Sequence, residues 1–132
     1  MRRSIRLALF ALALAAPAHA AAPDPELKKF IAAFAEALKA KTPDTAAKLA
    51  HFPIRNAVYQ EPETVSAKDF KSHFNGIKLA EFIACLKANA PTRSPAQSRR
   101  LGEWSVDCNG NIFYFGKFDG AWRYSGFENV NE

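Results

Sequence analysis

The chain has 132 residues, 48% of them hydrophobic, and a formal charge of +5 at pH 7. Three arginines and no acidic residue lie in the first twenty residues, so without this segment 112 residues carry a charge of only +2. So small an excess of positive charge argues against a nucleic-acid-binding surface, and we expect no nucleic-acid partner. A chain of this length fits one domain with one hydrophobic core.

The first twenty residues have the three parts of a secretory signal peptide. Basic residues 1–6 precede an apolar run from Leu7 to Ala16, and Ala18-His19-Ala20 has the small residues of a cleavage site. The apolar run is about half the ~20 residues that a membrane-spanning helix needs. We therefore predict cleavage after Ala20, a mature domain of residues 21–132 without a membrane span, and a periplasmic or secreted location.

The mature chain is predicted to begin with two helices. Asp24-Pro25 is a typical helix start, and an apolar stripe with helical spacing follows it: Leu27, Phe30, Ile31, Phe34 and Leu38. A shorter helix should begin at Thr42-Pro43 and run to Leu49. His51 either closes its end or serves as a ligand or proton-transfer group.

A short hairpin and two more helices are predicted next. Residues 55–59 are interpreted as a strand, residues 60–63 as a turn, and Thr64-Val65 as a brief returning strand. Residues 66–69 resemble a capping box ahead of a helix that carries Phe70 and His73 and ends at Asn75-Gly76. A further apolar helical stripe comprises Leu79, Phe82, Ile83 and Leu86.

The C-terminal third predicts a polar loop and then a sheet. Residues 91–100 have the composition of a flexible surface loop, with a basic cluster of Arg93, Arg99 and Arg100. Asn109-Gly110 and Asp119-Gly120 then interrupt aromatic and β-branched runs between Leu101 and Val130. Such dipeptides favour type I′ turns, so we predict a three-stranded antiparallel meander.

The two cysteines, Cys85 and Cys108, both lie in the exported part of the chain. An even number of cysteines in an oxidising compartment favours a disulfide. The alternative is a buried free Cys85 on a helix and an exposed Cys108 beside a turn. No His or Cys stands two to four residues from either cysteine, so we predict no metal site, and we expect no cofactor.

Several short motifs together resemble the nuclear transport factor 2-like superfamily, and more narrowly its small exported bacterial members. They are His51-Phe52-Pro53-Ile54-Arg55, Ser66-Ala67-Lys68-Asp69-Phe70, Gly110-Asn111-Ile112-Phe113-Tyr114-Phe115 and Asp119-Gly120-Ala121-Trp122-Arg123-Tyr124. The resemblance spans most of the mature chain and implies an α+β cone, with N-terminal helices packed on a curved antiparallel sheet. It also implies a pocket between the sheet and the helices, but no particular activity.

Enzymes of this superfamily, such as polyketide cyclase-like and ketosteroid isomerase-like members, place an acid or base with Tyr, His or Asp donors in that pocket. The candidates for such catalytic roles are Tyr114, Tyr124, Asp107, Glu128 and His73. The candidate ligand-pocket residues are Tyr59, Tyr114, Trp122, Tyr124 and Arg123. Structural packing is the competing interpretation for the tyrosines. Strict alternation in the last strand would place Tyr124 and Glu128 on one face, and Arg123 with Ser125 on the other.

Three functions follow from these candidates. We expect an exported, non-catalytic protein that binds a small ligand or acts as an accessory protein. The first alternative is a cyclase or isomerase-like enzyme, which needs a tyrosine and a carboxylate to converge in one cavity. The second is a protein-interaction module that forms a homodimer through an exposed aromatic face of the sheet. The basic cluster suits either an acidic partner, such as lipid headgroups or a cell-wall polymer, or simply a solvated loop.

Overall fold

The computed structural model describes residues 22–40, 43–57, 63–73 and 79–131. The elements in chain order are α1 (Pro25–Lys39), α2 (Pro43–Ala47), β1 (Ala50–Asn56), β2 (Thr64–Val65), α3 (Phe70–His73), α4 (Leu79–Ala88), β3 (Thr92–Arg93), the 3-10 helix η1 (Ala96–Ser98), β4 (Trp104–Cys108), β5 (Asn111–Phe118) and β6 (Ala121–Asn129). The predicted signal peptide, Tyr59 and the Asn75-Gly76 helix end lie outside the described residues. Within those residues, no helix is long and apolar enough to cross a membrane.

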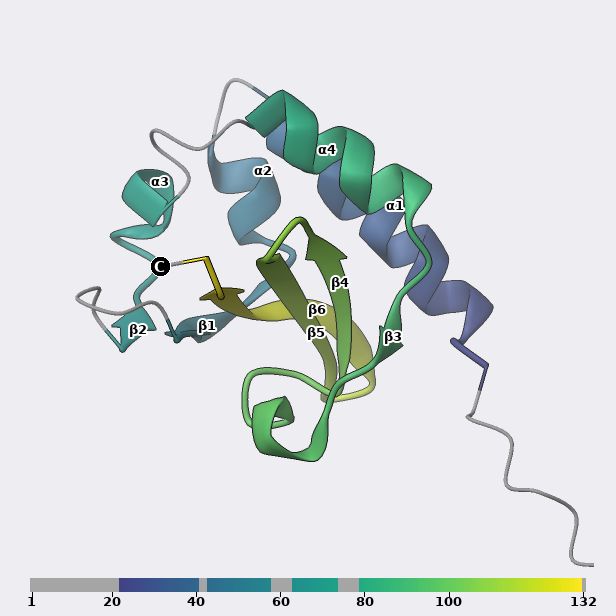
Figure 1. Ribbon diagram of the computed structural model, residues 1–132. Helices are drawn as coiled ribbons and strands as arrows, with labels where there is room; N and C mark the ends of the chain where they lie inside the picture. Colours follow the sequence, from purple (N-terminus) through teal and green to yellow (C-terminus); the bar gives the residue numbers. More distant parts are fainter. Residues whose placement is uncertain (1–21, 41–42, 58–62, 74–78, 132) are drawn as a thin grey trace, which may run out of the picture.

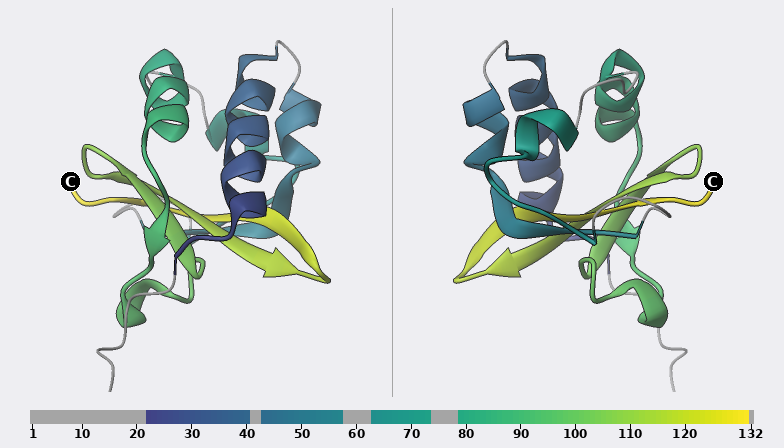
Figure 2. Two further views of the ribbon diagram at one scale, coloured as in Figure 1. Left: turned by 90° about the vertical axis from the view of Figure 1, so that its right-hand side faces the viewer. Right: turned by 90° about the vertical axis from the view of Figure 1, so that its left-hand side faces the viewer.

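The strands form one curved sheet in the order β2-β1-β6-β5-β4-β3, with the helices layered on one of its faces (Figures 1 and 2). This arrangement confirms the predicted α+β class. Strand β1 runs parallel to β6, whereas every other pair of neighbours is antiparallel, so the sheet is mixed. We call the side that carries the helices the helix face and the opposite side the outer face. The segment between β3 and β4, which contains η1, lies on the outer face (Figure 2).

Helix α1 begins and packs as its sequence predicts. The carboxylate of Asp24 accepts a hydrogen bond from the backbone N–H of Glu26 at 2.9 Å, which satisfies one donor of the first turn. The apolar stripe is buried against the sheet, where the ring of Phe34 stacks on Tyr124 with centroids 4.8 Å apart. It also meets Phe115 edge-on at 5.9 Å. Side chains of α1 and of the sheet thus form the centre of the core.

The predicted meander is confirmed as β4, β5 and β6. Asn109 and Gly110 have φ angles of 54° and 84°, and Asp119 and Gly120 have 50° and 78°, as type I′ turns require. The carboxylate of Asp107 accepts a hydrogen bond from the N–H of Gly110 at 2.7 Å and so closes the first turn. Asp107, a candidate for catalysis, therefore has a structural partner.

The predicted alternation of β6 is wrong beyond Tyr124, because the strand contains a bulge. Tyr114 and Phe115 of β5 are partners of Gly126 and Tyr124, so Ser125 is the extra residue. Tyr124 faces the helices, whereas Gly126 and Glu128 lie on the outer face opposite Tyr114 and Ile112. Tyr124 and Glu128 therefore point to opposite faces.

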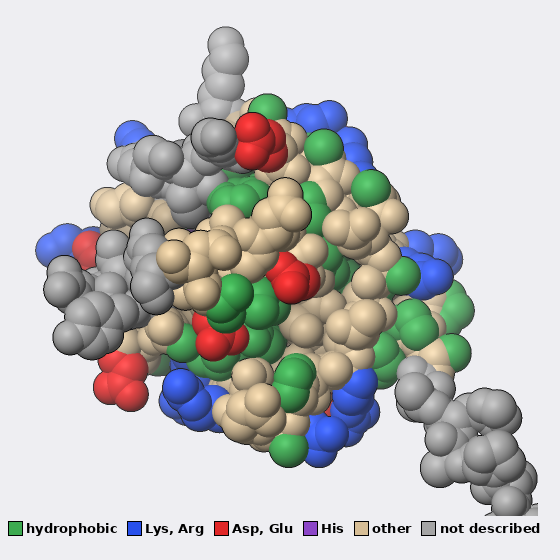
Figure 3. Space-filling view, viewed as in Figure 1, with side chains coloured by type: hydrophobic (Ala, Val, Ile, Leu, Met, Phe, Trp, Pro, Cys, Tyr) green, Lys and Arg blue, Asp and Glu red, His purple; other side chains and the backbone are tan. Residues whose placement is uncertain are grey.

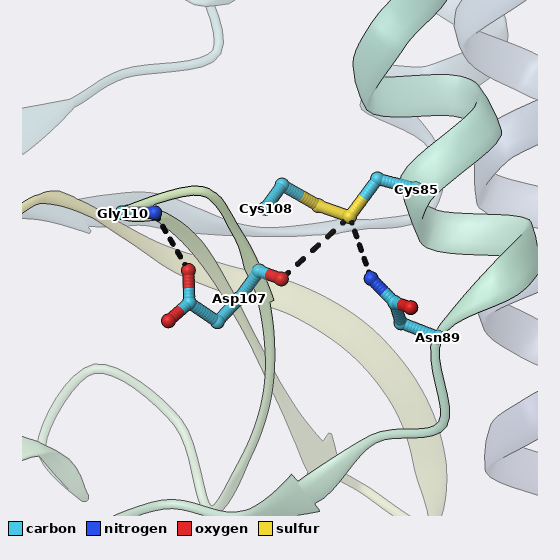
Figure 4. Close-up of a disulfide and its surroundings, with 5 residues drawn as sticks. All are labelled: Cys85, Asn89, Asp107, Cys108 and Gly110. Atoms are coloured by element: carbon cyan, nitrogen blue, oxygen red, sulfur yellow. Dashed lines mark hydrogen bonds between the residues drawn. A yellow bond between two sulfur atoms is a disulfide. The ribbon is translucent and has the colours of Figure 1, made fainter.

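The disulfide joins the helix layer to the sheet (Figure 4). Cys85 of α4 and Cys108 at the end of β4 are bonded, with Cα atoms 5.9 Å apart. The side-chain amide of Asn89 donates to the sulfur of Cys85 at 3.1 Å. Free cysteines, the alternative considered from the sequence, are thus excluded.

Two segments differ from the predictions. His51 does not close α2, which ends at Ala47, but lies inside β1, because pairing with β6 extends the chain from Leu49, whose C=O accepts from Tyr124 N–H at 2.9 Å. Residues 91–100 are not an irregular loop. They contain β3 and η1, because β3 pairs with β4 and Ser94 N–H donates to the C=O of Glu103 at 2.9 Å.

Candidate functional site

A cleft of about 370 Å³ lies on the outer face, between β1 and the segment that links β3 to β4. Its walls come from three parts of the chain that are distant in sequence: His51, Pro53, Arg55, Arg99, Arg100, Leu101, Gly102, Glu103, Gly116, Lys117, Phe118 and Ser125. A volume of this size suits a small molecule rather than a chain segment. We call this space the outer cleft.

Strand β1 supplies one wall through its alternation. Ile54 is fully buried among core residues. His51, Pro53 and Arg55 are exposed and line the cleft on the opposite face. The imidazole of His51 stacks on the ring of Phe118, with centroids 3.7 Å apart and planes inclined by 6°.

The facing wall is held against the sheet at Leu101 and Gly102. The hydroxyl of Ser125 donates to the C=O of Leu101 at 2.7 Å. A Cβ atom at Gly126 would lie 2.6 Å from that same oxygen, and one at Gly102 would lie 2.8 Å from the backbone nitrogen of Phe115. The backbone can approach this closely only because both positions are glycine. The wall is therefore a fixed part of the fold.

Positive charge dominates the outer cleft. Arg55, Arg99, Arg100 and Lys117 line it, and Glu103 is its one acidic residue. The ammonium group of Lys117 lies over the Trp122 ring, whereas the three arginines have no such contact among those found in the described part of the chain. No ion pair found among the described residues includes any of these three arginines. Arg99 donates its Nε to the C=O of Ser94 at 3.3 Å, which orients its guanidinium group. Lys and Arg side chains gather at the lower edge of the molecule in Figure 3, around the segment that links β3 to β4.

Four of the five candidate catalytic residues form two separate pairs. On the outer face, the hydroxyl of Tyr114 donates to Glu128 at 2.6 Å. Burial, and then the hydrogen bond to Glu128, raise the pKa of Tyr114 to about 12. On the helix face, Nε2 of His73 and the hydroxyl of Tyr124 are 2.9 Å apart and share a hydrogen bond. The sheet separates the two pairs, so they do not form one site.

Tyr124 is fully buried and His73 is half-buried, and both are uncharged at neutral pH. Burial lowers the pKa of His73 from 6.5 to about 4 and raises the pKa of Tyr124 well above 10. The rings of Phe70 and Phe127 lie 6.5 and 5.4 Å from the imidazole. This pair is part of the aromatic core.

Trp122 and Arg123, two further candidate ligand-pocket residues, do not line the outer cleft. Arg123 donates to the C=O of Trp122 at 2.8 Å. The ring of Trp122 packs against the core, with the ammonium group of Lys117 5.5 Å from its centre. Tyr59 lies outside the described residues. The structure thus does not bring the described members of the predicted pocket together.

Two of the three residues of the predicted basic cluster line the outer cleft. Arg99 and Arg100 do so, whereas Arg93 places its guanidinium carbon 5.9 Å from the centre of the Trp104 ring. Sequence reasoning missed Arg55 and considered His51 only as a candidate ligand or proton-transfer group, without placing it in a cleft. The large apolar residues Phe52 and Ile54 stand two apart, with His51, Pro53 and Arg55 at the positions between and beside them, and this period of two was the signal that could have grouped the cleft residues.

The described residues contain no group of three or more His, Cys, Asp or Glu side chains that could hold a metal ion. The comparisons with protein-family models, with curated proteins and with solved structures found no match to this chain. Functional inference therefore rests on the geometry of the cleft.

Proposed function

We propose that this protein is an exported, non-catalytic binding protein that holds a small anionic ligand in the outer cleft. The observation that carries the proposal is the convergence of Arg55, Arg99 and Arg100 on one concave site without an ion-pair partner in the described structure. A guanidinium group offers paired N–H donors that match the oxygens of a carboxylate or a phosphoryl group.

Export and family membership are parts of the same proposal. The disulfide between Cys85 and Cys108 supports folding in an oxidising compartment, where such bonds persist. The layer of helices on a curved sheet supports a nuclear transport factor 2-like assignment. The proposed site differs from the pocket which that resemblance implies, because the outer cleft lies on the face away from the helices.

Binding without catalysis is favoured over the enzyme alternative. The pair of Tyr114 and Glu128 and the pair of His73 and Tyr124 lie on opposite faces of the sheet. They could not act on the same ligand, and none of these four residues lines the outer cleft. The homodimer alternative has no supporting observation, since the described residues include only one exposed large hydrophobic side chain, Val130.

Isothermal titration calorimetry with inorganic phosphate and with citrate tests the proposal. The mature, oxidised protein should bind at least one of these anions at a single saturable site, more weakly as salt is raised. Arg55→Ala and Arg100→Ala should each lower the affinity by at least about tenfold, because each removes a charge-assisted hydrogen bond.

Arg93→Ala is the matched control. Arg93 is an exposed arginine at the end of β3, but it does not line the cleft, so its replacement should leave the affinity unchanged. The absence of binding at millimolar concentrations of both anions would refute the proposal. Equal weakening by all three substitutions would also refute it, because the effect would then come from net charge alone.

A further inference from the structure

The outer cleft has two chemically different ends, and this contrast deepens the proposed function on which the inference rests. We call the end formed by Arg55, Arg99 and Arg100 the cationic end, and the end formed by His51 and Phe118 the aromatic end. All five residues line the cleft. A ligand that fills it would meet both ends.

The strand register places the cationic end. Arg55 of β1 is the partner of Gly126 of β6. A Cβ atom at Gly126 would lie 2.9 Å from the Cβ of Leu101, so the backbone that follows Arg100 lies over the same point of the sheet. Arg55 and the backbone that follows Arg100 therefore lie at one position on the outer face.

The aromatic end lies toward the tip of the β5–β6 hairpin. Phe118 is the last residue of β5, and its partner Ala121 begins β6. His51, whose ring stacks on Phe118, precedes Arg55 by four residues along β1. Four residues of a regular strand span about 13 Å, but β1 is irregular here, because Ala50 and Arg55 pair with Tyr124 and Gly126 across a register shift. The two ends are therefore closer together than that, and one substituted ring can bridge them.

The acidic residue of the cleft lies between these ends along its wall. Glu103 follows Gly102, whose backbone approaches that of Phe115, whereas Leu101 lies at the cationic end. A second negative charge on the ligand near Glu103 would be repelled. The negative charge of the ligand thus belongs at one end of the molecule.

We infer that the ligand of the outer cleft is a small aromatic anion: one carboxylate or phosphoryl group attached to a flat ring. The anionic group would bind the guanidinium groups at the cationic end. The ring would pack at the aromatic end, where an exposed imidazole and a phenyl ring already form a parallel stack.

Phenyl phosphate and methyl phosphate are the probes that test this inference. Both carry the same anionic group, and only phenyl phosphate has a ring. By calorimetry with the mature, oxidised protein, we expect phenyl phosphate to bind roughly three- to tenfold more tightly, the range that an aromatic contact contributes. His51→Ala should abolish this difference, whereas Arg55→Ala should weaken both ligands.

His51→Phe distinguishes stacking from charge. It keeps an aromatic ring at this position and removes the imidazole nitrogens, so it should retain the preference for phenyl phosphate. Equal affinities of the two probes for the wild-type protein would overturn the inference and leave the proposed anion site intact. If neither probe binds, and phosphate and citrate do not bind either, the proposed function itself is refuted. A preference that survives His51→Ala would also overturn the assignment of the aromatic end.

Discussion

Loss of the disulfide should destabilise this protein by a predictable amount. Cys85 and Cys108 are 23 residues apart, and their bond links α4 to β4. In the chain-entropy model, closing a loop of that length stabilises the folded state by about 3 kcal/mol. With an unfolding entropy of about 2.1 cal/mol/K per residue, that free energy corresponds to a fall in Tm of roughly 13 °C for a domain of this size.

Thermal unfolding followed by circular dichroism would measure the effect. The mature protein should show the fall in Tm on addition of a phosphine reductant, and the double variant Cys85→Ser/Cys108→Ser should unfold near the reduced wild type. The same reductant should not change the Tm of the double variant, which controls for its other effects. An unchanged Tm of the wild-type protein on complete reduction, verified by thiol counting, would refute the reasoning that this bond restrains the unfolded chain.

Two further predictions concern His73 and Gly120. Burial holds the pKa of His73 at about 4 in the folded protein, below the 6.5 of the unfolded chain. As the pH falls, the unfolded state therefore binds the proton first. The free energy of unfolding should fall by up to about 3 kcal/mol between about pH 6.5 and pH 4. Urea titrations should show this fall, and an equally steep one in His73→Gln would contradict it. Gly120→Val should lower the free energy of unfolding, measured by urea titration, by roughly 1–2 kcal/mol, because Gly120 has a φ of +78° that a β-branched residue adopts only with strain. Gly120→Asn, which tolerates this conformation, is the control, and equal stability of the two variants would count against strain at the turn.

Local signals in the sequence were sufficient for most of the fold. The two type I′ turns need residues that tolerate positive φ, and Asn109-Gly110 and Asp119-Gly120 provide them. Asp24 caps α1 with its own side chain, which depends on no distant residue. Where a neighbouring side chain or backbone group determines the structure, sequence reasoning was reliable.

Long-range contacts determine the parts that could not be predicted. Residues 91–100 are polar, yet Ser94 is buried and β3 pairs with β4, which begins eleven residues beyond Arg93. Likewise, His51 is extended because β1 pairs with β6, more than 65 residues later in the chain. Neither partner is visible from the local composition.

The bulge at Ser125 explains why the candidate residues of β6 lie on opposite faces of the sheet. It reverses the alternation of β6, so that Tyr124 completes the core while Ser125 and Gly126 face the segment from Ser94 to Glu103. Ser125 then binds the Leu101 backbone, and the absence of a side chain at Gly126 lets that backbone lie on the sheet. The same irregularity that moves Tyr124 away from Glu128 therefore creates the wall of the outer cleft. A ligand site on this face requires the bulge, and a ligand site among the tyrosines would require its absence.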